Sequence, residues 1–99
     1  MEKSIWERLN NGEKITMSED REYLEVTSME MYRCLGLCSE LNKYKANDPK
    51  IRETLDELLE NRLPYNSDIL PPMQIDYGHQ LRIHNRVFIN HSVCINAAA

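Results

Sequence analysis

The C-terminal quarter of the chain repeats with a period of six residues. From Tyr77 it reads YGHQLR, IHNRVF, INHSVC and INAAA, so Tyr or Ile opens every row and Leu or Val takes the fifth place of the first three. This pattern is typical of a hexapeptide β-helix, in which each hexad forms one short strand and three hexads close one coil. A hairpin or meander of ordinary strands is the alternative that the period alone leaves open.

The first 64 residues predict helices. Ser4 and Glu7 form an S-x-x-E capping box, and Gly12 suits the end of the short helix that they begin. A longer helix is expected from about Asp20 to Lys43. Its predicted buried stripe comprises Leu24, Met31, Leu35, Cys38 and Leu41, with Tyr32 and Cys34 near the edges.

A third helix is expected within residues 47–64, with Asp48 as its N-cap and Pro49 in its first position. The short loop before it favours an antiparallel pair with the long helix. Pro71 and Pro72 disfavour helix and favour an extended path. The chain is therefore predicted to be α+β, with a helical region at 1–64, a connector at 65–76 and the repeat at 77–99.

Charge and hydropathy exclude several classes of partner. The net charge is -4 and the basic residues form no cluster, which argues against nucleic acid and against an anionic membrane surface. No apolar run approaches the roughly 18 residues that a membrane span needs. The N-terminal residues lack the long apolar segment of a signal peptide, so we expect a cytoplasmic protein.

The cysteines and histidines predict no metal or redox site. An odd number of cysteines does not suit a disulfide framework, and Cys34 and Cys38 are expected to be small residues facing the core, with metal binding or redox chemistry as the less favoured alternative. The three histidines, His79, His84 and His91, lack partners at metal-ligand spacing and are expected at surfaces or corners. With three glycines, the chain cannot build a glycine-rich phosphate loop.

Three stretches of the chain, the last of which includes part of the repeat, resemble the maltose and galactoside O-acetyltransferases, a group of hexapeptide-repeat acyltransferases. These stretches are ERLNNGEKI with the acidic SEDREYL, LNKYKANDPKIRETLDELL, and PPMQIDYGHQLRIHNRVFIN. The last is the most specific, because DYG and VFIN are joined in hexad register. Gln80 and His84 depart from the family pattern, which usually has Asn and Gly there, and both changes fall at predicted corners.

The resemblance implies that the chain is the N-terminal part of an acetyl-CoA-dependent sugar O-acetyltransferase. It implies helices that form the family's cap, followed by the first coil of a left-handed parallel β-helix, and a homotrimer that binds the sugar between subunits. Family members continue for several more coils, which carry the catalytic His and the acetyl-CoA site. We therefore expect the coil to be truncated and the chain alone to be inactive, with no catalytic residue of its own.

By the same resemblance, four residues are expected on the acceptor side. Asn90 of VFIN matches the sugar-binding Asn, and Phe88 matches an aromatic that lines the acceptor pocket. Asp76 of IDYG matches a polar pocket residue, and His91 is expected to face the same pocket. The structural alternatives are a corner role for Asn90, coil packing for Phe88 and a capping or turn role for Asp76.

Two other functional interpretations remain open. The chain could be a non-catalytic oligomerisation or interaction module derived from that family, because an open coil end exposes strand edges and apolar residues such as Val93 and Ile95. An unrelated small α+β protein is the other interpretation, in which the DYG and VFIN match is accidental.

Overall fold

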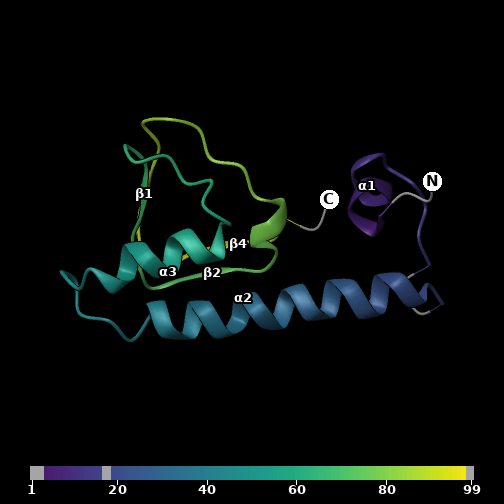
Figure 1. Cartoon of the computed structure of the whole chain (residues 1–99), viewed down its shortest axis with the longest axis horizontal. Coiled ribbons are helices and arrows are strands. Elements are labelled where there is room, and N and C mark those ends of the chain that lie inside the picture. Colours follow the sequence, from purple (N-terminus) through teal and green to yellow (C-terminus); the bar gives the residue numbers. More distant parts are fainter. Residues whose placement is uncertain (1–3, 17–18, 98–99) are drawn as a thin grey trace.

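The chain folds into helices and short parallel strand pairs, and so has an α+β structure (Figure 1). The computed structural model describes residues 4–16 and 19–97. In chain order the elements are α1 (Ile5–Asn10), the π-helical η1 (Tyr23–Thr27), α2 (Ser28–Leu41), α3 (Lys50–Leu58), β1 (Asp68–Ile69), β2 (Met73–Ile75), the 3₁₀ helix η2 (Gly78–Gln80), β3 (Phe88–Ile89) and β4 (Val93–Ile95).

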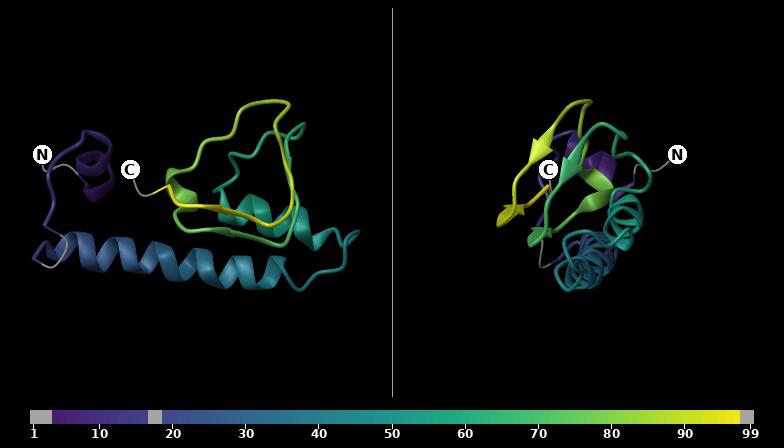
Figure 2. Two further views of the ribbon diagram at one scale, coloured as in Figure 1. Left: turned by 180° about the vertical axis from the view of Figure 1, so that it is seen from behind. Right: turned by 90° about the vertical axis from the view of Figure 1, so that its left-hand side faces the viewer.

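The strands come from two successive passes of the chain around one loop. β1 pairs in parallel with β3, and β2 pairs in parallel with β4. Each residue lies opposite the one twenty positions later, as in Asp68 with Phe88. Figure 2 shows the two passes lying side by side. A hairpin or meander would pair neighbouring strands antiparallel, so that alternative is wrong for the described residues.

The paired region begins earlier than the sequence repeat indicates. β1 and β2 both lie within residues 65–76, the segment expected to be a connector. Ile69 and Ile75 are fully buried there and lie opposite Ile89 and Ile95. Tyr77, expected to open the first row, follows β2 and precedes η2 instead.

The helices form where capping and apolar spacing predict them. The Ser4 hydroxyl accepts from the Glu7 N–H at 3.2 Å, and Gly12 has a left-handed φ of 71° beyond the end of α1. α2 and α3 lie antiparallel, as expected (Figure 1). The Asp48 carboxylate accepts from the Lys50 N–H, but Pro49 occupies the N-cap rather than the first helical position.

The buried face of α2 differs from the predicted stripe. Leu24 and Leu35 are 45% and 38% exposed, whereas Cys34 and Leu37 are buried. The long helix meets α3 and β2 on a face rotated from the apolar stripe, and the π-helical turn of η1 changes the register of the residues before it. The residues of α2 that reach the core are Cys34, Leu37, Cys38 and Leu41.

The core lies between α2, α3 and the loop of strands. Its members include Leu55, Leu58, Ile69 and Ile75, all fully buried. The Asn42 side chain, just after α2, bonds to both the N–H and the carbonyl of Met73 and so fixes the start of β2.

Within the described ranges, no helix has the length and apolar character to span a bilayer.

Candidate functional site

Three of the residues expected on the acceptor side lie together at one corner. Phe88 in β3 is 64% exposed, and Asn90 and His91 are exposed in the turn between β3 and β4. The Asn90 side-chain oxygen accepts from the His91 N–H at 2.8 Å, a local bond typical of a corner residue. Its side-chain NH₂ group has no partner among the described residues, so it is available to a ligand.

Asp76 lies away from that corner. It follows β2 and its carboxylate accepts from the Gln74 side chain at 3.2 Å, while Asn90 precedes β4. Since β2 and β4 run parallel, Asp76 and Asn90 are at opposite ends of the same strand pair. One copy of the chain therefore does not bring all four expected residues to one site.

A cluster of charged side chains surrounds η2, and the sequence analysis did not identify it. Glu30 on α2 accepts from both Arg33 Nε and Arg33 Nη2, at 2.7 and 2.9 Å, and from the His79 N–H at 2.8 Å. Burial opposes ionisation of Glu30, but the bonds from Arg33, the His79 N–H and the Cys34 thiol outweigh it and lower the pKa of the carboxyl group. Glu30 is thus a carboxylate that ties α2 to η2.

Two guanidinium groups hold main-chain carbonyls in the same region. Arg33 donates to the carbonyls of Glu57 and Leu58 at the end of α3, at 3.0 and 3.1 Å. Arg62 donates to the carbonyls of Gly78 and His79, both at 2.8 Å. Burial is the main cause that lowers the pKa of the Arg62 guanidinium; the neighbouring Arg82 lowers it further, while Glu60 and Glu30 act in the opposite direction.

His79 is oriented by a carboxylate. Its Nδ1 lies 2.5 Å from Glu60 Oε1, so Glu60 accepts a hydrogen bond from the Nδ1–H group and the Nε2 atom is left available. Glu60 follows α3 with a left-handed φ of 53°. This arrangement gives His79 a fixed ring orientation and a nitrogen that can accept a hydrogen bond.

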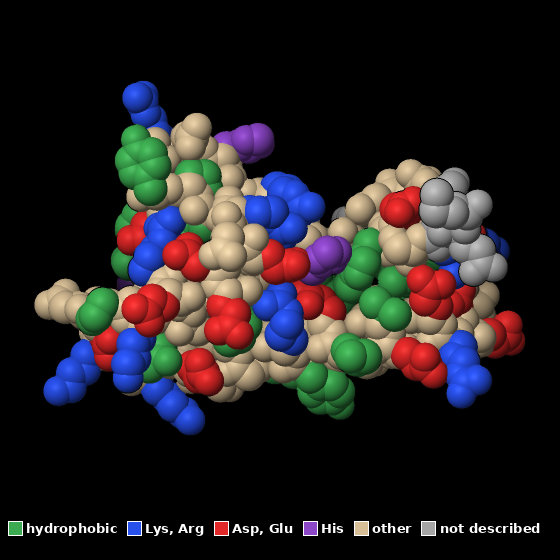
Figure 3. All heavy atoms as spheres, viewed as in Figure 1, with side chains coloured by type: hydrophobic (Ala, Val, Ile, Leu, Met, Phe, Trp, Pro, Cys, Tyr) green, Lys and Arg blue, Asp and Glu red, His purple; other side chains and the backbone are tan. Residues whose placement is uncertain are grey.

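A pocket of about 440 Å³ lies beside this cluster, between α1 and α2. Figure 3 shows a hollow between the lobe that contains α1 and the rest of the molecule, with hydrophobic, charged and His side chains gathered near it. The Trp6 ring lies 5.1 Å from the His79 ring and 6.1 Å from the Tyr77 ring, centroid to centroid. The residues that line the pocket are Trp6, Val26, Met29, Glu30, Arg33 and His79.

No sequence signal links the members of this pocket. Trp6 and His79 are far apart in the chain and belong to no shared motif. The side chains of Asn10 and Gln80 form two reciprocal hydrogen bonds, at 3.0 and 3.2 Å, which help to hold α1 against η2. The i, i+3 spacing of Glu30 and Arg33, which predicts an ion pair on the helix surface, was the only sequence pattern that involved residues of this pocket.

The thiols offer no nucleophile in this pocket. Cys34 and Cys38 are free and buried, and burial raises the pKa of Cys34 to about 12. This agrees with the prediction that they are core residues. In the part of the chain that the structure describes, no three His, Cys, Asp or Glu side chains are grouped closely enough to hold a metal ion.

Comparisons with models of known protein families, with curated proteins and with solved structures give no match to this chain. Any function must therefore be argued from the residues and their geometry. The two places that carry such an argument are the corner at Phe88, Asn90 and His91 and the pocket beside Trp6 and His79.

Proposed function

We propose that the chain forms the helical cap and the first coil of an acetyl-CoA-dependent sugar O-acetyltransferase of the maltose and galactoside type. The coil would be a left-handed parallel β-helix. The observation that carries the proposal is the parallel pairing of β1 with β3 and of β2 with β4 after one loop of the chain. Stacked parallel strands from successive passes are the basic element of a β-helix.

The side chains inside the loop support the same proposal. Ile69 and Ile75 are six residues apart and buried, and Ile89 and Ile95 pack against the same core. A coil of three hexads returns after about 18 residues, whereas the pairing here advances by twenty. Ile75 and Ile83 are eight residues apart, so the two additional residues fall around η2.

The corner at Asn90 has the groups that an acceptor sugar needs. The NH₂ group of Asn90 can donate to a hydroxyl, and the exposed ring of Phe88 can cover the apolar face of a sugar. His91 adds a second polar side chain beside them. Because Asp76 lies at the other end of the strand pair, the four residues could share one acceptor site only if different copies contribute them, as in a homotrimer.

In such an enzyme a base removes the proton of the sugar hydroxyl, which attacks the acetyl thioester. We assign no catalytic base and no acetyl-CoA site to this chain. The proposal thus concerns the cap and the acceptor side, and this chain alone is expected not to transfer acetyl groups from acetyl-CoA.

The test joins residues 1–99 to the later coils of a maltose O-acetyltransferase and measures acetylation of maltose, glucose and a galactoside. We expect an active trimer in which Asn90→Ala lowers kcat/KM at least tenfold. Asn47→Ala, an exposed residue in the loop between α2 and α3, is the matched control and should leave kcat/KM unchanged. A folded trimeric chimera without activity would overturn the proposal.

A second candidate is an assembly module without catalysis. β3 and β4 each pair on one side, and no other described strand covers their outer edges. Val93 and Ile95 are partly exposed there, and such edges favour pairing with another chain. Sedimentation at several concentrations tests this candidate: a species that remains monomeric at the highest concentration excludes self-assembly.

A further inference from the structure

We propose that the pocket between α1 and α2 binds small aromatic carboxylates, a function separate from the acetyltransferase assignment. The pocket has a volume of about 440 Å³, which falls within the range of small-molecule sites. It is formed by segments distant in the sequence, from Trp6 on α1 to His79 on η2, and it opens to solvent.

One side of the pocket suits a flat apolar ring. The Trp6 and His79 rings lie 5.1 Å apart and are tilted by 50°, which leaves aromatic surface beside the opening. Val26 and Met29 complete the apolar wall. Met29 is 73% exposed, so a bound ring would remove apolar surface from water.

The polar groups that remain available are mainly donors. The Trp6 indole N–H has no hydrogen-bond partner among the described residues. Arg33 Nη1 carries two protons and, within residues 4–16 and 19–97, makes one bond, to the Glu57 carbonyl, at 3.0 Å. Against these two donors, the His79 Nε2 atom is an acceptor without a described partner, because Nδ1 carries the proton that bonds to Glu60. A ligand with acceptor oxygens fits this set better than a ligand with donors.

The charges around the pocket favour an anion. The nearby acids Glu30 and Glu60 already accept bonds, Glu30 from Arg33 and Glu60 from the Nδ1–H group of His79. Arg62 and Arg82 lie close to the same region, and burial together with Arg82 lowers the pKa of Arg62. An incoming carboxylate would place a negative charge near these guanidinium groups and could accept a hydrogen bond from the second Nη1 proton of Arg33, whereas a neutral amide lacks the charge.

The long helix contains a π-helical turn where it borders the pocket. Val26 belongs to the π-helical turn η1, in which the Thr27 hydroxyl donates to the Tyr23 carbonyl. Single π-helical turns within helices occur frequently at functional sites. Here the turn lies directly before Met29 and Glu30, two residues that line the pocket.

The binding test uses Trp6, which is the only tryptophan in the chain and therefore reports on this pocket alone. Phenylacetate is titrated while indole fluorescence is recorded, with acetate as the charged ligand without a ring and phenylacetamide as the ring without a charge. We expect a saturable change with phenylacetate, at a Kd on the order of 1 mM, and at least tenfold weaker binding of both controls. An equal response to phenylacetamide, or a response that does not saturate, would overturn the proposal.

A pair of variants locates the site. Met29→Glu places a negative charge on the pocket wall and should weaken phenylacetate binding at least tenfold. Tyr32→Glu makes the same change in charge on a neighbouring α2 residue that is 69% exposed and does not line the pocket, and it should bind within twofold of the original chain. Both keep Trp6, and its indole N–H signal in ¹⁵N NMR spectra checks folding and binding together. Equal binding by the two variants would place the ligand elsewhere and overturn the proposal.

Discussion

Gly78 lies so close to the carbonyl of Leu58 that no side chain fits between them: a Cβ on Gly78 would be 2.2 Å from the Leu58 oxygen. The Gly78 N–H also donates to the Cys34 sulfur at 3.2 Å, and its carbonyl accepts from Arg62. The start of η2 is thus pressed against both α2 and the end of α3. Because η2 also supplies His79, this contact positions one wall of the pocket.

Gly78→Ala should therefore destabilise the chain strongly. The contact is with main-chain atoms that cannot rotate away, so we expect a loss of about 3 kcal/mol in the free energy of unfolding, measured with urea. Gly36→Ala is the matched control, since a Cβ there meets nothing within 4 Å. It should raise stability by about 1 kcal/mol, because Ala favours a helix over Gly. Similar stabilities for the two variants would contradict the contact.

Arg33→Lys should also destabilise the chain, although the charge is kept. Arg33 binds both Glu30 oxygens and two carbonyls of α3, and an ammonium group cannot reproduce this planar set of bonds. We expect a loss of about 2 kcal/mol in the free energy of unfolding. Arg21→Lys, whose side chain is 89% exposed and contacts Glu25, should change stability by less than about 0.5 kcal/mol. Equal effects of the two substitutions would show that the Arg33 fork is dispensable.

Local signals in the sequence predicted the helices well, because caps and turns depend on neighbouring residues. The Ser4 half of the capping box, the left-handed Gly12 and the antiparallel pair of α2 and α3 are all present. The buried face of α2 was harder to predict. Leu24 and Leu35 continue an apolar stripe, but the core is reached by Cys34 and Leu37, and the position of α3 and β2 decides which face is buried.

Long-range features were less accessible from the sequence. The period of six residues indicated short strands, but the first paired strand, β1, was not predicted because Pro71 and Pro72 gave residues 65–76 the character of a connector. The pocket depends on Trp6 meeting His79, a contact made through the tertiary position of α1. No spacing rule relates residues so far apart, so only the structure brings them together.

Glu30 should make stability depend on acidic pH. Its pKa is lowered in the folded chain from an ordinary value of 4.5, so its bonds stabilise the fold above that value, and this contribution is lost as the pH falls through the folded pKa. Glu30→Gln should be less stable than the original chain at pH 7, and the difference should shrink below about pH 4.5. Glu40→Gln, an exposed residue near the end of α2, should follow the original chain at every pH. Urea unfolding at several pH values measures this, and a constant difference for Glu30→Gln would contradict it.

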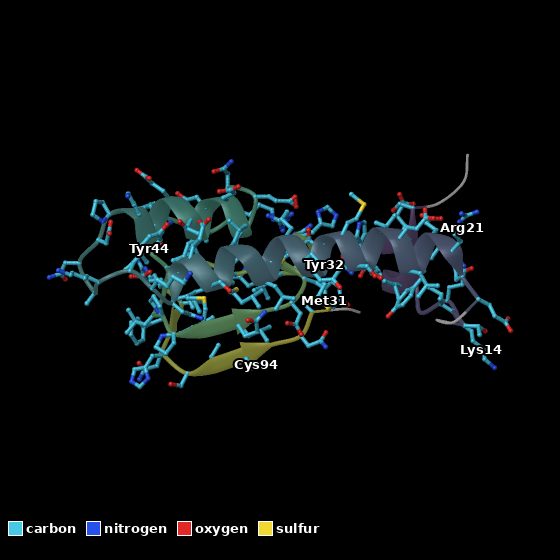
Figure 4. All side chains as sticks on the ribbon, turned by 90° about the horizontal axis from the view of Figure 1, so that it is seen from below. Lys14, Arg21, Met31, Tyr32, Tyr44 and Cys94 are labelled. Atoms are coloured by element: carbon cyan, nitrogen blue, oxygen red, sulfur yellow. The ribbon has the colours of Figure 1, made fainter. Side chains whose placement is uncertain are left out.

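The three thiols should differ sharply in reactivity. Cys94 is exposed on β4, the strand of its pair that lies farther from α2 (Figure 4). Cys34 and Cys38 are buried, and burial raises the pKa of both thiols, which disfavours the reactive thiolate. A disulfide reagent such as DTNB should therefore modify one thiol per chain in native buffer and all three in denaturant. Cys94→Ser should abolish the native reaction and leave two thiols that react after unfolding. Rapid modification of Cys34 or Cys38 in the folded chain would show that the core between α2 and β2 opens far more readily than its packing indicates.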